Sequence, residues 1–309
     1  MSAATLTWPR LGLGCAALTA PGVDGERNAR AVIERAWERG IRFFDVAPLY
    51  GGGLSEERLG AALDGLRRAD YVLTTKTGVT RPYAQGATPP GSTKFRAADV
   101  WDFSREGTRI SVQRSLERLR TNYLDLVHLH DVDGHEAECG PACETLGELR
   151  VHGSVRGISV GSNGVQAPRM LLELGLLDAM LIAGRYTLLD ESAEGLFASA
   201  NTAGVHVIAA GVLNSGVLAH GITPNATFDY LPPTSAVVER VKRLQAWCAP
   251  HGVALAAAAL QFVTRNPYVS SVLLGPRSVS ELDELLDAFA QPLPTGFWEG
   301  RPAMTEPNP

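Results

Sequence analysis

The sequence of 309 residues has the composition of a folded, water-soluble protein, with 45% hydrophobic and 20% charged residues. Its net charge of -5 excludes the basic surface of nucleic-acid-binding proteins, so we expect small-molecule partners. The sequence shows neither an export leader nor an apolar run of membrane-spanning length, so we expect a cytoplasmic protein. Four cysteines are too few for a disulfide framework in a chain of this length, and we expect free thiols.

The first predicted strand ends in a glycine-rich segment. The residues Gly12-Leu13-Gly14-Cys15-Ala16-Ala17 mimic the glycine fingerprint of dinucleotide-binding proteins. However, Pro21, Gly22 and Gly25 follow where that motif requires a helix. We therefore interpret these glycines as a tight turn at a strand end, and we expect the first helix over residues 26–39.

Helix and strand patterns alternate along the whole chain. Short apolar runs predict strands over residues 10–14, 41–45, 71–76, 123–131, 155–160, 179–183, 205–210 and 269–274. Apolar residues at helical spacing predict further helices over residues 55–67, 105–120, 143–152, 166–174, 191–202, 234–249, 254–265 and 278–290. Eight strands alternating with helices favour a single-domain (β/α)8 TIM barrel over an open sheet.

One connection is too long for a simple turn. Residues 77–103 are rich in glycine and proline and carry Tyr83, Phe95 and Trp101. Long loops with aromatic residues are typical of binding sites. We expect an active-site loop here, with a possible role as a substrate lid.

Polar side chains stand at the ends of several predicted strands. Asp45, Lys76 and His130 each end a strand, and Tyr50 follows Asp45 by five residues. Taken alone, Asp45 and Tyr50 fit a purely structural role as well as a functional one: loop amides could hydrogen-bond the carboxylate, and the phenol could simply be packed under the loop. In a barrel, however, all carboxyl ends of the strands meet at one face, so these four groups should converge. There, Lys76 should lower the pKa of Tyr50, Asp45 should keep Lys76 charged, and His130 should orient a substrate oxygen.

These residues resemble the aldo/keto reductase family. The segment Phe44-Asp45-Val46-Ala47-Pro48-Leu49-Tyr50-Gly51, the pair Ser55-Glu56, Lys76, and Asp125-Leu126-Val127-His128-Leu129-His130 match the family's motifs over nearly the whole chain. The resemblance implies a nicotinamide-dependent oxidoreductase on a (β/α)8 barrel. It also implies that Tyr50 is the proton donor or acceptor, that Lys76 and Asp45 tune it, and that His130 orients the substrate.

The same resemblance implies a set of cofactor-binding residues. Ser162 and Asn163 match the pair that holds the nicotinamide amide, and residues 212–216 resemble the loop that faces the pyrophosphate. Glu281 stands where the family often has Arg or Gln; an acid there would repel a 2′-phosphate, which favours NAD slightly over NADP, although Arg277 argues the other way. The residues implicated are Ser162, Asn163, Gly211, Asn214, Ser215, Gly275, Arg277, Glu281 and Glu284.

Within the family, three stretches are most similar to the aldose dehydrogenase branch, which acts on sugars such as fucose, D-threo-aldoses and galactose. These stretches are residues 47–51, 128–131 and 184–190. The resemblance implies oxidation of a cyclic sugar at its anomeric carbon to a lactone, with Tyr50 as general acid or base.

Two other classes of function remain open. A barrel that binds nicotinamide as a sensor would keep Ser162 and Asn163 but would not need Tyr50 and Lys76 together, so their joint presence favours an enzyme. A metal-dependent hydrolase would rest on His128, His130 and Asp131. We predict no metal site, because barrel interiors usually fill such positions with packed side chains.

Overall fold

The computed structural model describes residues 8–80, 99–229 and 231–302. Eight parallel strands form a closed barrel in the order β1-β10-β9-β8-β7-β6-β3-β2, and β1 closes it by pairing with both β10 and β2. The strands are β1 (Leu11–Gly14), β2 (Phe43–Asp45), β3 (Val72–Thr77), β6 (Leu126–His130), β7 (Ile158–Ser162), β8 (Ala179–Ala183), β9 (His206–Ala210) and β10 (Val269–Leu274). The predicted single-domain (β/α)8 barrel is confirmed.

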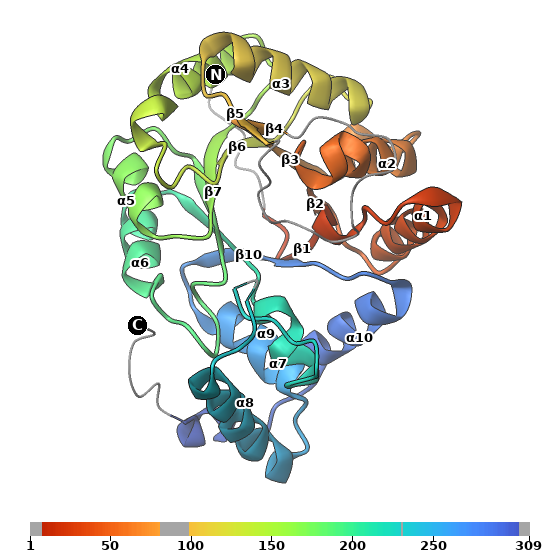
Figure 1. Ribbon diagram of the computed structural model, residues 1–309, viewed down its shortest axis with the longest axis vertical. Coiled ribbons are helices and arrows are strands. Elements are labelled where there is room, and N and C mark those ends of the chain that lie inside the picture. The colour runs from red at the N-terminus through yellow and green to blue at the C-terminus, as the bar shows by residue number, and fades with distance from the viewer. Residues whose placement is uncertain (1–7, 81–98, 230, 303–309) are drawn as a thin grey trace.

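Helices surround the strands, with α1 and α2 on one side and α5 and α6 on the opposite side (Figure 1). Their bounds are α1 (Gly22–Glu38), α2 (Leu54–Leu63), α3 (Arg105–Arg118), α4 (Cys139–Val151), α5 (Gln166–Glu173), α6 (Glu194–Thr202), α7 (Val217–His220), α8 (Ser235–Cys248), α9 (Leu255–Arg265) and α10 (Val279–Ala290). The hydroxyls of Ser104, Thr234 and Ser278 begin α3, α8 and α10 by accepting the amide N–H three residues later.

The glycine-rich start of the chain differs from its prediction. Gly12 and Gly14 belong to strand β1 itself, and the turn is the 3-10 segment Cys15–Ala17 that follows. A Cβ on Gly12 would lie 2.6 Å from the Phe43 ring, so Gly12 is needed for close packing inside the barrel. Helix α1 begins at Gly22, earlier than expected, but Leu18 to Pro21 still separate it from the glycines.

The long connection also differs in part. Strand β3 extends through Thr77, and β4 (Val79–Thr80) pairs antiparallel with β5 (Val100–Trp101), so the predicted loop over residues 77–103 carries a small sheet at its base. Residues 81–98, with Tyr83 and Phe95, lie outside the described residues.

Helix α4 begins at Cys139 rather than at residue 143, so Cys139 and Cys143 are buried on one helix. All four cysteines are free thiols. No group of metal-binding side chains occurs among the residues described.

No individual helix in the described part of the chain has the length and hydropathy to cross a membrane. Segments 235–251 and 255–265 reach that threshold only as a pair, and they meet at a bend of 98°.

Candidate active site

A hollow of about 480 Å³ opens where the carboxyl ends of the barrel strands meet. It brings together nearly all the residues that the sequence implicated, since its lining includes Asp45, Tyr50, Lys76, His130, Ser162, Asn163, Gly211, Asn214, Ser215, Gly275, Arg277 and Glu281. These residues come from strand ends and loops that are far apart in the sequence. The predicted convergence of Asp45, Tyr50, Lys76 and His130 at one face therefore occurs.

A buried ion pair forms the base of this hollow. Lys76 Nζ donates to Asp45 Oδ2 at 2.6 Å and to the carbonyl of Val46 at 2.9 Å, while Thr74 Oγ1 donates to Asp45 Oδ1 at 2.8 Å. Burial raises the pKa of Asp45, but the Lys76 ammonium and His128 together outweigh burial and hold that pKa below its usual value. Burial likewise lowers the pKa of Lys76, and Asp45 more than restores it. Both groups are therefore charged at neutral pH.

Tyr50 lies against this pair. Lys76 Nζ is 4.9 Å from the centre of the Tyr50 ring, and the His130 ring meets the Tyr50 ring edge-on with centroids 6.0 Å apart. Burial raises the pKa of Tyr50 to about 12, although the Lys76 ammonium acts to lower it. The predicted direction of the Lys76 effect is thus right, but the predicted net lowering of the pKa is wrong, because removing the phenolate from water outweighs the ammonium.

His128 is part of the structure beneath the site rather than a metal ligand. Its Nε2 lies 3.3 Å from Asp45 Oδ1, and its Nδ1 lies 2.8 Å from Ser159 Oγ. The ring is fully buried, and burial lowers its pKa, so it is neutral. A neutral ring with Nδ1 accepting from Ser159 presents its Nε2–H to the Asp45 carboxylate. Ser159, His128, Asp45 and Lys76 therefore form a continuous polar chain that ends beneath Tyr50.

His130 and Asp131 form the adjoining wall. His130 Nε2 lies 3.5 Å from Asp131 Oδ2. Burial, followed by the Lys76 charge, lowers the pKa of His130 well below its usual value. A neutral imidazole can donate one hydrogen bond to a substrate oxygen without carrying a charge of its own.

The Ser162-Asn163 pair is held by two acids that follow β6. Ser162 Oγ donates to Asp133 Oδ2 at 2.6 Å and accepts the Gly164 N–H at 2.8 Å. Asn163 Nδ2 donates to Asp131 Oδ1 at 3.0 Å. The Ser162 hydroxyl proton and one N–H of the Asn163 amide are engaged, and each side chain keeps an oxygen acceptor, which suits the NH2 group of a carboxamide.

The loop after β9 shows that the residues present fit a bound dinucleotide. Asn214 is 3% exposed, and neither of its side-chain polar atoms has a hydrogen-bond partner within the described structure. Buried polar groups without partners are rare and costly. Asn214, Ser215 and Gly216 also have left-handed backbones, with φ of 45°, 56° and 95°. This conformation lets consecutive amides turn toward one ligand, as at phosphate sites.

The far end of the hollow carries a second ion pair. Glu281 accepts from the Arg277 amide at 2.7 Å and from Arg277 Nε at 3.2 Å. Glu284 does not line the hollow: it is exposed on α10 and accepts from Ser280 Oγ at 2.9 Å. Leu285 lines the hollow in its place.

Three residues that organise the site were not predicted in this role: the sequence analysis named Asp131 only for the rival hydrolase and gave Asp133 and Arg185 no role. Asp131 and Asp133 hold the Ser162-Asn163 pair, and Arg185 donates to the Asn163 carbonyl, to Asp190 and to Asp229. All three are charged residues just beyond the ends of β6 and β8. That position, the same one that identified Asp45 and Lys76, is the signal that could have found them.

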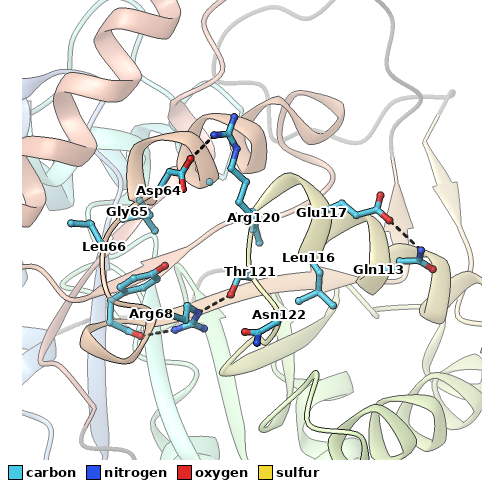
Figure 2. A pocket seen from close by; sticks show the side chains of 14 residues that line it. Asp64, Gly65, Leu66, Arg68, Gln113, Leu116, Glu117, Arg120, Thr121 and Asn122 are labelled. Carbon is cyan, nitrogen blue, oxygen red and sulfur yellow. Dashed lines mark hydrogen bonds and ion pairs between the residues drawn. The ribbon is translucent and has the colours of Figure 1, made fainter.

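A larger hollow, of about 630 Å³, lies near the amino ends of β3 and β6, away from this chemistry (Figure 2). Its charged side chains are already engaged: Arg120 contacts Asp64, Arg68 contacts Thr121, and Gln113 contacts Glu117. Carboxyl ends of barrel strands carry the active site, and amino ends serve stability. We therefore assign the chemistry to the smaller hollow.

Comparisons with known proteins agree with this geometry. A family model described as the aldo/keto reductase family matches residues 10–300. D-threo-aldose 1-dehydrogenase from a Pseudomonas species is 36% identical over 96% of this chain and 94% of its own length. Pyridoxal 4-dehydrogenase from Microbacterium luteolum is 36% identical over 95% of this chain and 93% of its own length. The solved holo form of an aldo-keto reductase from Bacillus halodurans has a TM-score of 0.76 and 26% identity, covering 96% of this chain and 93% of that chain.

Proposed function

This chain belongs to the aldo/keto reductase family and is a nicotinamide-dependent oxidoreductase of small carbonyl compounds, and we propose that it oxidises cyclic hemiacetals, aldoses above all, to lactones. The observation that carries the proposal is the buried Asp45–Lys76 pair beneath Tyr50 in a hollow of about 480 Å³. A sensor with little turnover would gain nothing from a buried charge pair next to a phenol, because charges are expensive to bury.

Tyr50 is the general base in the oxidation. As phenolate it takes the proton of the anomeric hydroxyl, and as phenol it returns a proton to a carbonyl oxygen in the reverse reaction. Lys76 stabilises the phenolate, Asp45 keeps Lys76 charged and in place, and the neutral His130 donates to the reacting oxygen. A bound nicotinamide supplies the hydride acceptor or donor.

The two relatives' names support the substrate class. Aldoses and pyridoxal both carry an aldehyde together with a hydroxyl group that can close onto it, so both form cyclic hemiacetals in water. Oxidation of a cyclic hemiacetal at the former aldehyde carbon gives a lactone. The proposed substrate is therefore a cyclic hemiacetal with several hydroxyl groups, and a panel of sugars identifies which one is used.

The cofactor is held by residues along the hollow. Ser162 and Asn163 accept from the nicotinamide carboxamide, and the loop of Gly211, Asn214 and Ser215 binds the pyrophosphate. Gly275 and Arg277 line the adenosine end, where Glu281 engages the Arg277 guanidinium and adds a negative charge. A carboxylate there repels a 2′-phosphate and accepts from a ribose hydroxyl, so we propose NAD as the preferred cofactor.

The test is a substrate panel. Purified protein is given NAD or NADP with a set of aldoses, with pyridoxal, and with simple alcohols, and reduced nicotinamide is followed by absorbance. We expect turnover with at least one aldose, a lactone as the product by NMR, and a higher kcat/KM with NAD. Turnover of simple alcohols alone, or a ring-opened product formed directly, would contradict the proposal.

A further inference from the structure

Asp131 is one of three non-glycine residues of the hollow with a strained backbone, together with Asn214 and Ser215. Its φ is 44°, in the left-handed region that non-glycine residues rarely occupy, although Asp tolerates it better than most. The Asp131 N–H donates to the carbonyl of Gly161 at 2.7 Å, so the strained turn is tied to the next barrel strand. Such strain persists where the surrounding structure fixes it, and it concentrates at functional sites.

The Asp131 carboxylate is the least well paired acid of the hollow within the described chain. Asp45 has Lys76, and Glu281 has Arg277. Asp131 has the Asn163 amide at 3.0 Å on one oxygen and, on the other, only a neutral imidazole nitrogen of His130 at 3.5 Å. Its side chain is 14% exposed, and burial raises its pKa to about 7. A carboxylate in this position gains from any further hydrogen-bond donor that enters the hollow.

The position of Asp131 limits which hydrogen-bond donor of a substrate can reach its carboxylate. It follows His130 directly and lines the same hollow as Tyr50. In the proposed reaction the reacting oxygen lies at Tyr50 and His130, and Asp131 Oδ2 is 3.5 Å from His130 Nε2, so a hydroxyl close to the reacting carbon is the substrate donor nearest to Asp131. Above its pKa, Asp131 is a carboxylate that accepts a hydrogen bond from such a hydroxyl and gains no hydrogen bond from an ether or a hydrocarbon.

We propose that Asp131 is the residue that recognises the substrate, accepting a hydrogen bond from the hydroxyl on the carbon next to the reacting carbon. The inference rests on the proposed function and narrows it to 2-hydroxy aldehydes, their hemiacetals and equivalents. Aldoses, the compounds in one relative's name, carry a hydroxyl on that neighbouring carbon, whereas pyridoxal carries its ring hydroxyl one carbon further from the aldehyde carbon. A substrate without it leaves the buried carboxylate unpaired, and sites of this kind reject such substrates strongly.

The test compares two aldehydes that differ only in this hydroxyl, lactaldehyde and propanal, in the reductive direction with NADH. The measured quantity is the ratio of their kcat/KM values. We expect the wild type to favour lactaldehyde by about 10- to 100-fold, the range of one hydrogen bond to a charged group. D131A should remove most of that preference, and D131N, which keeps an acceptor oxygen but no charge, should give an intermediate ratio.

Glu136→Gln is the matched control, because Glu136 lies in the segment that follows β6, is partly exposed and does not line the hollow. It should keep the wild-type ratio. Thermal unfolding of each variant checks that it is folded. If D131A does not fold, the comparison is made with D131N alone. If both Asp131 variants keep the wild-type ratio, or if the wild type reduces both aldehydes equally well, the role of Asp131 is wrong. Failure of the wild type to reduce either aldehyde would overturn the role of Asp131 in recognising 2-hydroxy aldehydes, whereas the oxidation of aldoses in the substrate panel tests the proposed function separately.

Discussion

At the scale of single residues, the site rests on opposing effects on one phenol. Burial makes the Tyr50 phenolate unfavourable, and the Lys76 ammonium makes it more favourable, with a resulting pKa of about 12. Tyr50 is therefore a phenol at neutral pH, ready to donate a proton to a carbonyl. Oxidation requires the minor phenolate form, and the neighbouring Lys76 lessens that penalty.

The protonation of Tyr50 predicts how oxidation depends on pH. The phenolate fraction rises about tenfold per pH unit below the pKa, so kcat/KM for oxidation should climb between about pH 7 and about pH 9. Reduction uses the phenol and should not climb in this range. Initial rates in both directions across this range check the prediction, and an oxidation rate that falls as the pH rises would contradict it.

His128 predicts a contrast between two substitutions. H128L removes the imidazole nitrogen beside Asp45 and leaves Ser159 Oγ with only its long contact to the Val160 carbonyl, so we expect a loss of about 1–3 kcal/mol in the free energy of unfolding. H128Q can place an amide N–H near the position of Nε2 and should lose less. Urea denaturation of both variants measures the difference. Equal losses would mean that His128 acts by packing alone.

At the scale of elements, the site is made by the ends of strands and the starts of helices. The end of β2 supplies Asp45, β3 supplies Lys76, β6 supplies His130 and β7 supplies Ser162. The start of α10 adds the second ion pair, because its cap residue Ser278 accepts the Glu281 N–H while the Glu281 side chain engages Arg277. A single helix start thereby sets the charge at the far end of the hollow.

The start of α10 predicts a shift in cofactor preference. E281Q removes the carboxylate and weakens its hold on Arg277, so we expect the affinity for NADP relative to NAD to rise about tenfold, which is about 1.4 kcal/mol. Dissociation constants from quenching of tryptophan fluorescence measure the ratio. E284Q is the matched control, since Glu284 lies on the same helix outside the hollow. Identical behaviour of the two variants would show that Glu281 does not face the phosphate.

At the scale of the whole molecule, the two ends of the barrel serve different purposes. The carboxyl end holds the reactive groups, while the amino end holds the buried carboxylate of Asp125. Asp125 accepts from Arg68 at 2.7 Å, from Arg156 at 2.9 Å and from the Leu73 amide at 2.9 Å. This cluster joins β3, β6 and the start of β7 far from the hollow, and we infer a role in stability.

Asp125 therefore predicts a change in stability without a change in chemistry. D125N leaves two arginines without their carboxylate, and we expect the free energy of unfolding to fall by about 3 kcal/mol, at the lower end for breaking a buried ion pair. The kcat of the folded variant should stay within about twofold of the wild type, because Asp125 does not contact the hollow. Urea denaturation measures the loss of stability, and steady-state kinetics measure kcat. A large fall in kcat without a loss of stability would contradict the structural role of Asp125.

The alternation of strands and helices, and with it the barrel, could be predicted because each buried strand is a short, largely apolar run, and several of these runs have a polar residue at the carboxyl end. The convergence of Asp45, Lys76 and His130 then followed from barrel geometry. The contacts of Asp131 and Asp133 with the Ser162-Asn163 pair, and those of Arg185 with Asn163 and Asp229, could not be predicted, because they join segments that are far apart in the sequence. The net pKa of Tyr50 could not be predicted either, since it depends on how completely the folded chain excludes water.

The measurement that tests the central claim most directly is the kcat of Tyr50→Phe on the best aldose of the substrate panel. The substitution removes one hydroxyl and leaves the ring that packs against His130. We predict that kcat falls by about 10²- to 10⁴-fold, the usual contribution of a general acid or base, while NAD still quenches the tryptophan fluorescence of the variant. A Tyr50→Phe enzyme that turns over at the wild-type rate would contradict the account.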